Sequence, residues 1–407
     1  MGGMPISKLR GAGHTPSLLA ALLHFDVSFM VWVLLGALGA TIGADLGLSP
    51  LQKGLMVAVP PLSGSVFRLI LGPLVDRLGA RRTGLASLAL TLLPLAWGWL
   101  AAGTFVELLG LGLLLGIAGS SFVVALPLAS RWYPPEKQGL AMGIAGAGNS
   151  GTLIAALAAP RVAAQVGWHA TFGLAAIPVV VVWVRFAVMA KEPPTLVTRA
   201  EDQPAPGARG LLAEADARWL CGLYMVTFGG FVGLASYLPV FFVDRFGLTL
   251  VTAGAFTALC ASAGSFLRPL GGWLADRAGG TRVLGTVLAS VAALAAGLGL
   301  LPGLGITVLL LWAVLGAFGL GNGAVFQLVG RRFPARVGGM TGLVGAAGGL
   351  GGFLLPFGFG ALEGSTGTFA LGFLAIAAIA GGGALVVTRR SSIATPLTAL
   401  APVGVPA

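Results

Sequence analysis

The chain has 407 residues, of which 57% are hydrophobic and only 9% are charged. Because a soluble domain carries about 25% charged residues, this composition excludes an ordinary soluble globule. The net charge of +11 would point to nucleic acid as a partner of a soluble protein. Here we expect no nucleic-acid binding, since the chain is mostly apolar stretches longer than the ~18 residues that mark a transmembrane helix, and we interpret the charge as membrane topology.

The cysteine and histidine residues indicate neither a disulfide framework nor a metal site. Cys221 and Cys260 both lie inside apolar runs, and His14, His24 and His169 are scattered along the chain. We therefore expect no metal and no cofactor. The apolar segments also lack a plausible nucleophile and paired carboxylates, so we do not expect an enzyme.

Charged, Pro-rich and Gly-rich breaks divide most of the chain into twelve apolar segments. Most of them hold 19 or more residues, which at 1.5 Å per residue is enough to cross about 30 Å of hydrocarbon as a helix. The sequence therefore predicts an all-α integral membrane protein. The predicted spans lie at about 18–43, 51–75, 83–102, 105–130, 138–160, 169–189, 217–243, 249–275, 283–301, 306–330, 338–361 and 366–388.

The basic residues of the predicted connections lie almost entirely on one side of the membrane. If the N-terminus is cytoplasmic, the opposite side holds only Lys53, Arg161 and Arg245, and the cytoplasmic connections hold nearly all the others. The positive-inside rule then places both termini in the cytoplasm. We expect a multi-pass protein of the cell inner (plasma) membrane.

The longest connection is polar, Pro-rich and central, as expected of a flexible linker between two halves. The predicted parts of the chain are a cytoplasmic N-terminus (1–17), an N-terminal six-helix bundle (18–189), a cytoplasmic linker (190–216), a C-terminal six-helix bundle (217–388) and a cytoplasmic C-terminus (389–407).

A shift of 200 positions places matching residues of the two halves on each other, which indicates an internal repeat. The matches include Arg68 with Arg268, Gly72 with Gly272, Asp76 with Asp276, Arg77 with Arg277 and Arg131 with Arg331. Two six-helix bundles from one duplicated unit resemble the major facilitator arrangement. In that arrangement the substrate site lies near the midplane, where the bundles meet.

The connection after the second span reads GPLVDRLGARR (72–82), and its echo after the eighth reads GGWLADRAGGTR (271–282). This pattern resembles the signature loop of the major facilitator superfamily. Its aspartates are expected to receive a hydrogen bond or an ion pair that breaks when the bundles rock. For Arg81 and Arg82, a solvated basic loop that only fixes topology is an equally open interpretation. The predicted conformational switch comprises Gly72, Asp76, Arg77, Gly272, Asp276 and Arg277.

Arg68 and Arg268 are predicted at the same depth in the second and eighth spans, about 12 Å inside the helix end. An Arg there costs about 2.5–3.5 kcal/mol, so two of them call for a compensating anion or a water-filled cavity. The alternative is that each pairs with a carboxylate elsewhere or snorkels to the interface. Because a guanidinium fork matches two oxygens on one edge, a small, planar, monovalent oxyanion is an apt ligand.

Two Gly-rich stretches occur in the fifth and eleventh spans, GIAGAGNSGT at 143–152 and GLVGAAGGLGGFLLP at 342–356. Both resemble signatures of the nitrate/nitrite porter family, as do GNGAVFQL at 321–328 and FMVWVLLGALG at 29–39. The resemblance runs from about residue 20 to residue 385. It implies a transporter of nitrate and nitrite that works by rocker-switch alternating access, either by nitrate/nitrite exchange or by nitrate/proton symport.

The resemblance also implies the residues of the substrate site. Arg68 and Arg268 would bind the anion, and Asn149 would supply an amide hydrogen bond. Tyr224 and Phe228 match the family's Y-x-x-x-F pattern and would supply a phenol donor beside an aromatic wall. Phe122 would form the opposite wall, with ordinary core packing as the alternative. The signature glycines, which would let these helices bend and slide, are Gly143, Gly146, Gly148, Gly151, Gly342, Gly345, Gly348, Gly349, Gly351 and Gly352.

Three further polar side chains lie inside predicted spans. Asn322 and Gln327 either line the pathway or bond a neighbouring helix, and we favour packing for Gln327. Asp26, in the first span, is a candidate proton site. The alternatives for Asp26 are an ion pair with Arg68 or Arg268, or a structural bond near the cytoplasmic end.

Two other functions remain as alternatives. A major facilitator porter for a short carboxylate would also use facing arginines, and a membrane anion sensor would bind without transporting. The sensor would need a large added soluble domain, which short predicted termini do not supply. The expected partners are nitrate, nitrite and the lipid bilayer, and we expect a functional monomer.

Overall fold

The computed structural model describes residues 13–192, 208–333 and 337–393, and within these ranges it contains helices and no strand. The helices of the first half are α1 (Thr15–Trp32), α2 (Leu34–Ala37), α3 (Gly39–Asp45), α4 (Pro50–Leu78), α5 (Ala80–Leu100), α6 (Phe105–Gly119), α7 (Phe122–Ser130), α8 (Pro135–Gly146), the short 3₁₀ helix η2 (Ala147–Ser150) and α9 (Gly151–Met189). Those of the second half are α10 (Ala208–Ala213), α11 (Ala215–Phe246), α12 (Leu250–Ala278), α13 (Gly280–Gly299), α14 (Leu304–Arg332), α15 (Val337–Thr366) and α16 (Ala370–Ile393).

The described chain has 11 helices that are long and apolar enough to cross a membrane. One of them, Ala141–Met189, has 49 residues and turns back at Gly167, whose φ of 81° and ψ of 162° are not helical. Only glycine adopts such a conformation at little cost. This helix therefore contains the fifth and sixth predicted spans, and the all-α fold class with twelve spans is confirmed.

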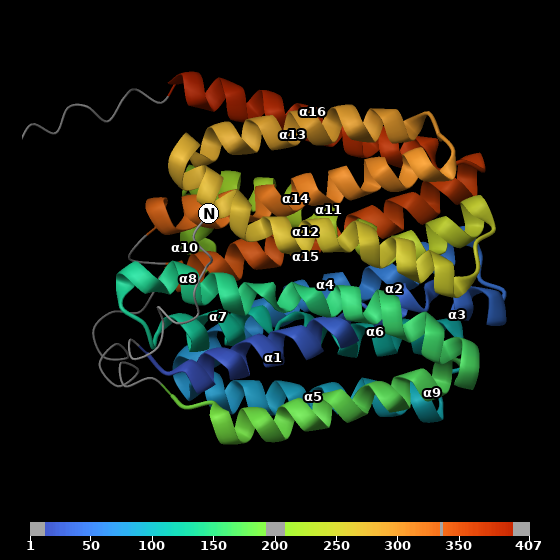
Figure 1. Cartoon of the computed structure of the whole chain (residues 1–407), viewed down its shortest axis with the longest axis horizontal. Helices are drawn as coiled ribbons and strands as arrows, with labels where there is room; N and C mark the ends of the chain where they lie inside the picture. Colours follow the sequence, from blue (N-terminus) through green and yellow to red (C-terminus); the bar gives the residue numbers. More distant parts are fainter. Residues whose placement is uncertain (1–12, 193–207, 334–336, 394–407) are drawn as a thin grey trace, which may run out of the picture.

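The two halves repeat the same helix pairings. In the first half, α4 packs on α6, α1 on α9 and α5 on α9; in the second, α12 packs on α14, α11 on α15 and α13 on α16. Each set pairs the second span with the fourth, the first with the fifth and the third with the sixth. Figure 1 shows α1–α9 in its lower part and α10–α16 in its upper part.

Three predicted spans are interrupted helices. The first is divided at Val33 and Leu38, and the fifth contains the 3₁₀ turn η2. The fourth breaks at Ser120 and Ser121, between α6 and α7. A stretch of 3₁₀ helix inside an α-helix often marks a hinge or a functional constraint.

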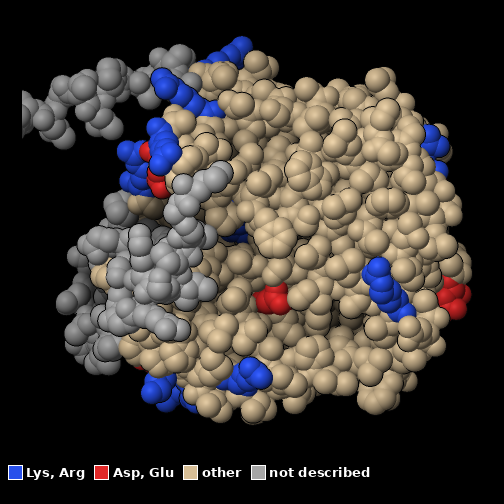
Figure 2. Space-filling view, viewed as in Figure 1, with Lys and Arg blue, Asp and Glu red and all other residues tan. Residues whose placement is uncertain are grey.

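We call the end of the molecule where the described chain stops at Glu192 and resumes at Ala208 the linker end, and the opposite end the far end; they lie at the left and the right of Figure 1. On the face shown in Figure 2, Lys and Arg gather mainly at the linker end, and most of the area between the two ends carries no charge. Large apolar side chains lie on the outer surface, among them Val106 at 74% and Val188 at 75% exposure. This is the pattern of a lipid-facing exterior.

The two halves touch most closely through glycines near the far end. A Cβ on Gly54 of α4 would lie 2.6 Å from the carbonyl oxygen of Pro356 in α15, and one on Gly36 would lie 2.5 Å from that of Ser236 in α11. No larger residue fits at either position without moving a backbone. The seam between the bundles is therefore closed in this half of the molecule.

Charged side chains complete this closure. Lys53 of α4 forms an ion pair with Asp244 of α11, and its aliphatic stem lies in the space left by Gly43 of α3. Within the second half, Tyr237 of α11 donates its hydroxyl proton to Glu363 of α15 at 3.0 Å, and this bond does not cross the seam. These carboxylates are therefore engaged by protein partners instead of being simply exposed to solvent at a helix end.

We predict that Lys53→Met favours opening of the far end, because it leaves Asp244 without its partner across the seam. A partly buried ion pair of about 1 kcal/mol corresponds to roughly a fivefold change in the ratio of open to closed molecules. Spin labels at the exposed Ala44 and Ser365, in a variant lacking Cys221 and Cys260, report the distance between the bundles. The charge-swapped double variant Lys53→Asp/Asp244→Lys should restore the closed population, and an unchanged distance distribution in Lys53→Met would contradict a latch role.

Candidate substrate site

Arg68 lies in the interior of α4 and is only 1% exposed. Its Nε and Nη2 donate to the carbonyl oxygen of Gly119, at 3.1 and 2.8 Å, and its Nη1 donates to the carbonyl oxygen of Gly345. Gly119 belongs to the first half and Gly345 to the second. The side chain therefore bridges the two bundles at the middle of the molecule.

The break between α6 and α7 explains why the Gly119 carbonyl is free to accept. In a continuous helix this oxygen would accept from the N–H of Val123, four residues later. Instead, Val123 donates to Ser120 at 3.0 Å, in a tighter turn. The fourth span thus gives up one helical hydrogen bond at this point, and the carbonyl becomes an acceptor for a buried cation.

The face of the Arg68 guanidinium is covered by aromatic rings. Its Cζ lies 5.3 Å from the ring centroid of Trp32 and 5.3 Å from that of Phe228. Trp32 is held in place because its Nε1 donates to the carbonyl oxygen of Pro60 at 2.9 Å. Cation–π contacts of this kind are worth about 2 kcal/mol when water is excluded, so the rings offset part of the cost of burying the charge.

Arg268 occupies the equivalent position in α12 and is half-buried. Its Nη2 donates to the hydroxyl oxygen of Tyr224 at 3.4 Å, and its Cζ lies 6.0 Å from the ring centroid of Phe122 and 5.6 Å from that of Phe326. Its Nη1 is buried and has no hydrogen-bond partner among the described residues. Arg268 is therefore less completely satisfied than Arg68.

One cluster of rings connects the two arginines. Tyr224 stacks on Phe228 with centroids 4.9 Å apart and an interplanar angle of 8°. Phe326 packs edge-on against Tyr224 at 5.1 Å and against Phe122 at 5.5 Å. Arg68 covers the Phe228 end of this cluster and Arg268 the Phe122 end, so the two guanidiniums converge on the same region from different bundles.

Neither arginine has a carboxylate partner in the described part of the chain. The ion pairs found there are Lys53–Asp244, Arg131–Asp76 and Arg332–Asp216. Arg68 and Arg268 therefore do not pair with carboxylates among the described residues. Burial of the Arg68 side chain also excludes snorkelling to the membrane interface for that residue. The two guanidiniums therefore have no counter-charge among the described residues.

Several buried polar groups near this region lack a partner. Both amide atoms of Asn149 and of Asn322 are unpaired within the described residues, as is the hydroxyl of Thr227. Asn149 lies in η2, which packs against α12, and Gly323, next to Asn322, abuts the backbone of Arg268. Buried amides are normally hydrogen-bonded, so unpaired ones beside a cation indicate a place for a ligand or water. The alternative of a hydrogen bond from Asn322 or Gln327 to a neighbouring helix is not found among the described residues.

The signature glycines fall into two groups. A Cβ on Gly348 would lie 2.6 Å from the Tyr224 ring, and one on Gly345 would lie 3.6 Å from Phe122 and 3.7 Å from Arg68. The positions that abut a neighbouring helix or side chain, most of them more closely than a Cβ allows, are Gly148, Gly151, Gly345, Gly348, Gly349, Gly351 and Gly352. Those with nothing within 4 Å are Gly143, Gly146 and Gly342, which are nearer the linker end.

Asp26 does not pair with either arginine. Its carboxylate accepts a hydrogen bond from the hydroxyl of Ser150 at 2.6 Å, and its backbone lies against Gly148 and Gly151. His24, two residues earlier, points elsewhere, with Nε2 3.3 Å from the Ser87 hydroxyl. The ion-pair alternative for Asp26 is thus wrong, and the carboxylate holds the turn that carries Asn149.

The two predicted switch loops differ. Arg131, at the end of α7, donates to Asp76 at 2.7 Å, so the ion pair joins two helices of one bundle. Asp276 has no ion pair among the described residues, and the nearby Arg277 lies over the Trp273 ring at 3.9 Å. Around Gly72 there is open space, and a Cβ on Gly272 would be 3.8 Å from the Gly323 oxygen. Arg77 is exposed.

Sequence reasoning missed some residues of the site. Phe326 was present in the GNGAVFQL stretch but was not recognised as a wall of the site. Trp32 was likewise present in the FMVWVLLGALG stretch but was not recognised as a partner of Arg68, and Thr227 lay in apolar context without a signal of its own. The Gly119 carbonyl had no signal in the sequence, because backbone acceptors are exposed by a helix break and not by a residue type.

Comparison with known proteins identifies the fold and the family. The family model of the Major Facilitator Superfamily matches residues 20–356. The chain belongs to the Major Facilitator Superfamily. A bacterial homologue of the human lysosomal transporter Spinster, in an inward-facing and occupied conformation, superposes on this superfamily member with a TM-score of 0.68 over 91% of this chain and 96% of that one. At 19% identity this likeness concerns the fold alone.

Relatives of higher identity place the chain in the nitrate/nitrite porter family. The probable nitrate/nitrite transporter NarK2 of Mycobacterium tuberculosis (strain ATCC 25618 / H37Rv) is 36% identical over 354 residues, 86% of this chain and 89% of that protein. The nitrite extrusion protein of Bacillus subtilis (strain 168) is 36% identical over 362 residues, covering 88% and 90%. The probable nitrate/nitrite antiporter NarK1 of Thermus thermophilus is 33% identical, covering 82% of each. The recognition of this family from the sequence is confirmed.

We predict that Gly348→Ala destabilises this superfamily member, because the added methyl group displaces the stacked Tyr224 and Phe228 rings. Overpacking of this kind costs about 1–3 kcal/mol. Gly342→Ala, on the same helix but with nothing within 4 Å, is the matched control and should be neutral or stabilising. Thermal unfolding of both variants in detergent checks this, and equal midpoints would contradict the packing role of Gly348.

Proposed function

We propose that this chain transports nitrate and nitrite across the membrane by rocker-switch alternating access, binding each anion at one central site. The observation that carries the proposal is the pair of guanidiniums, one from each bundle, that converge on one aromatic cluster without a carboxylate partner in the described residues. The relatives named as nitrate or nitrite transporters support the identity of the anion.

The chemistry of the cluster suits a small planar anion. Arg68 is held in a fixed plane by two backbone carbonyls, and Arg268 has an unpaired Nη1. The Tyr224 hydroxyl accepts from Arg268, so its own proton is available to donate. Asn149 adds an unpaired amide. We infer that the rings of Phe122 and Phe228 pack against the two faces of the planar anion, while the charged and polar groups donate hydrogen bonds to its oxygens.

The direction of opening follows from the packing. Close glycine contacts and the Lys53–Asp244 pair close the far end, whereas the positions of Gly143, Gly146 and Gly342 are open. We infer that the linker end is cytoplasmic, with both termini, because the basic residues gather there, and that the molecule represents a state closed to the outside. Transport then requires the far-end contacts to separate and the contacts of the linker end to form.

We favour exchange of nitrate for nitrite, driven by the gradients of the two anions, over nitrate/proton symport. Two facing cations repel each other when no anion is bound, which disfavours closure of the empty carrier. In this scheme Asp26 acts by positioning Asn149 through Ser150 and does not carry a proton.

We predict that Arg68→Lys severely reduces transport, because a lysine retains the charge but loses the fork that reaches Gly119, Gly345 and the anion together. Loss of a charge-assisted bond of about 1.5–3 kcal/mol corresponds to a fall in anion affinity of at least tenfold. The measurement is nitrite efflux from liposomes containing the purified protein, with and without external nitrate.

The same liposomes discriminate between substrates and energy sources. External nitrate should accelerate nitrite efflux in the absence of a pH gradient. Acceleration by acetate or formate in preference to nitrate would show a carboxylate porter instead. Binding of nitrate without any stimulated efflux would show an anion sensor.

Asp26→Asn tests the role of the first span. We expect exchange within about twofold of the wild type, since the asparagine oxygen can still accept from Ser150, and Asp26→Ala should be less stable by about 1 kcal/mol because the acceptor is lost. If a pH gradient drives nitrate uptake by the wild type and not by Asp26→Asn, then Asp26 is a proton site and symport replaces exchange.

A further inference from the structure

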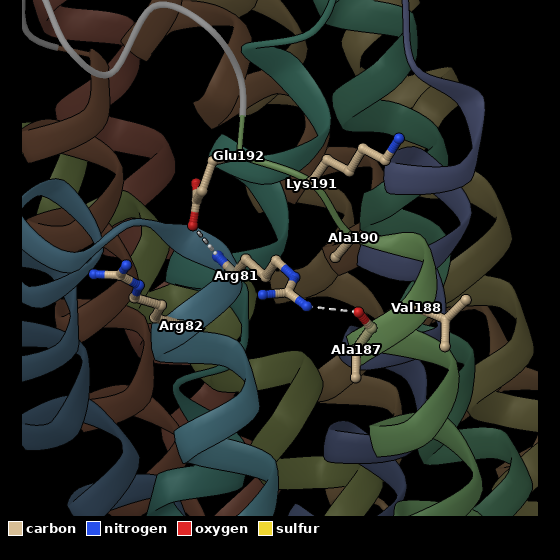
Figure 3. A pocket seen from close by; sticks show the side chains of 7 residues that line it. All are labelled: Arg81, Arg82, Ala187, Val188, Ala190, Lys191 and Glu192. Atoms are coloured by element: carbon tan, nitrogen blue, oxygen red, sulfur yellow. Dashed lines mark hydrogen bonds between the residues drawn. The ribbon is translucent and has the colours of Figure 1, made fainter.

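A basic groove lies at the linker end, away from the central site. It has a volume of about 380 Å³ and lies between the start of α5 and the end of α9. Its lining residues, all labelled in Figure 3, are Arg81, Arg82, Ala187, Val188, Ala190, Lys191 and Glu192. The signature loop of the second span thus meets the residue at which the linker begins.

The acidic residue in the groove is already engaged by the backbone. The Glu192 carboxylate accepts from the N–H of Arg81 at 2.6 Å and from the N–H of Ala80 at 3.2 Å, and so caps the first turn of α5. Gly79, beside this carboxylate, has a φ of 90°, a left-handed conformation that favours glycine. Backbone donors and the helix dipole therefore compensate the negative charge of Glu192.

The basic side chains of the groove keep their charge available. Arg81 donates from Nη2 to the carbonyl oxygen of Ala187 at 2.7 Å, as Figure 3 shows, and this bond leaves its charge uncompensated. Arg82 and Lys191 are exposed. None of the three forms an ion pair within the described residues. Arg81 thus lies across the groove, while the Arg82 and Lys191 side chains extend from its two sides, as Figure 3 shows, and the carboxylate of Glu192 is occupied by the backbone.

The wall of the groove is fixed in position. The Lys191 N–H donates to the Ser17 hydroxyl at 2.9 Å, and its carbonyl oxygen accepts from Trp132 Nε1 at 3.1 Å. The segment at the end of α9 is therefore tied to the first and fourth spans. The backbone of the wall therefore does not need to be ordered when a ligand binds, and the entropy cost falls on the exposed side chains alone.

An apolar surface continues from the groove along α9. Val188, Val184 and Val181 are 75%, 51% and 48% exposed, so they form a lipid-facing stripe one to two turns from the basic residues. A cationic pocket above an exposed apolar stripe has the shape of a phospholipid, with the phosphate in the pocket and an acyl chain on the stripe. A soluble phosphate ion has no apolar part that could contact the stripe.

We propose that this groove binds the headgroup of an anionic phospholipid, with Arg81 beside its phosphate and the exposed Arg82 and Lys191 side chains turning inward from the two sides to contact it. The site is a property of the first half alone, because the internal repeat has Thr281 in place of Arg81 and Ser391 in place of Lys191. A bound lipid links the signature loop to the start of the linker. The proposal does not depend on the identity of the transported anion.

The test is lipid binding to the full chain in nanodiscs or detergent, measured by native mass spectrometry with phosphatidylglycerol, phosphatidylcholine or inorganic phosphate as the added probe. We expect tight binding of phosphatidylglycerol and weak binding of phosphatidylcholine. Arg82→Gln/Lys191→Gln should lower the phosphatidylglycerol affinity roughly 30-fold, since each cation near the surface contributes roughly fivefold. Both side chains are exposed, and the thermal midpoint of the variant confirms that it folds.

Arg282→Gln/Arg331→Gln is the matched control, since it removes the same charge from exposed positions of the second half and should leave the affinity unchanged. An equal loss in this control would show a diffuse electrostatic attraction and overturn the proposal. It is also overturned if the Arg82→Gln/Lys191→Gln variant binds phosphatidylglycerol like the wild type, or if inorganic phosphate competes at equal concentration, which would indicate a soluble anion site.

Discussion

The burial of two permanent positive charges at the middle of a lipid-embedded protein determines much of the surrounding architecture. Arg68 is satisfied by backbone carbonyls of both halves and by two aromatic faces. The fourth span breaks between α6 and α7, and the Gly119 oxygen is thereby released from its own helix. Since carbonyl dipoles and rings carry no net negative charge, this environment tolerates the cations without neutralising them, and the region retains its attraction for an anion.

Glycine makes this arrangement possible at the level of packing. Gly348 lets the stacked Tyr224 and Phe228 rings pack directly against α15, and Gly345 lets Arg68 and Phe122 approach the same helix. Farther along, Gly54 brings α4 and α15 into backbone contact. Small residues at such positions allow helices in a membrane to pack closely where no hydrophobic effect drives them together. Most glycines of these stretches are thus explained by close contacts. Gly143, Gly146 and Gly342 lie in open space and have no packing explanation.

The sequence was sufficient to predict the spans, the internal repeat, the family and the positions of the two arginines, because each of these leaves a signal in residue type or spacing. An Arg in an apolar run is visible without coordinates, and its echo 200 residues later shows that it is not accidental. The exact positions of the breaks at Ser120 and within η2 were not predictable, since the Gly and Ser residues there permit a bend without fixing where it occurs. The acceptors of Arg68 and the pairing of Asp26 with Ser150 depend on which helices become neighbours, and hydropathy carries no information on that.

The bond from Arg68 to the Gly345 oxygen crosses from one half of the protein to the other. This carbonyl oxygen accepts from the guanidinium as an oxygen of a bound anion would under the proposed function. A neutral dipole attracts a cation less than an ion does, so the carbonyl satisfies the Arg68 donor without neutralising its charge. Under the proposed exchange, the dependence of transport on a bound anion is then governed by how strongly this one peptide carbonyl binds the Arg68 guanidinium.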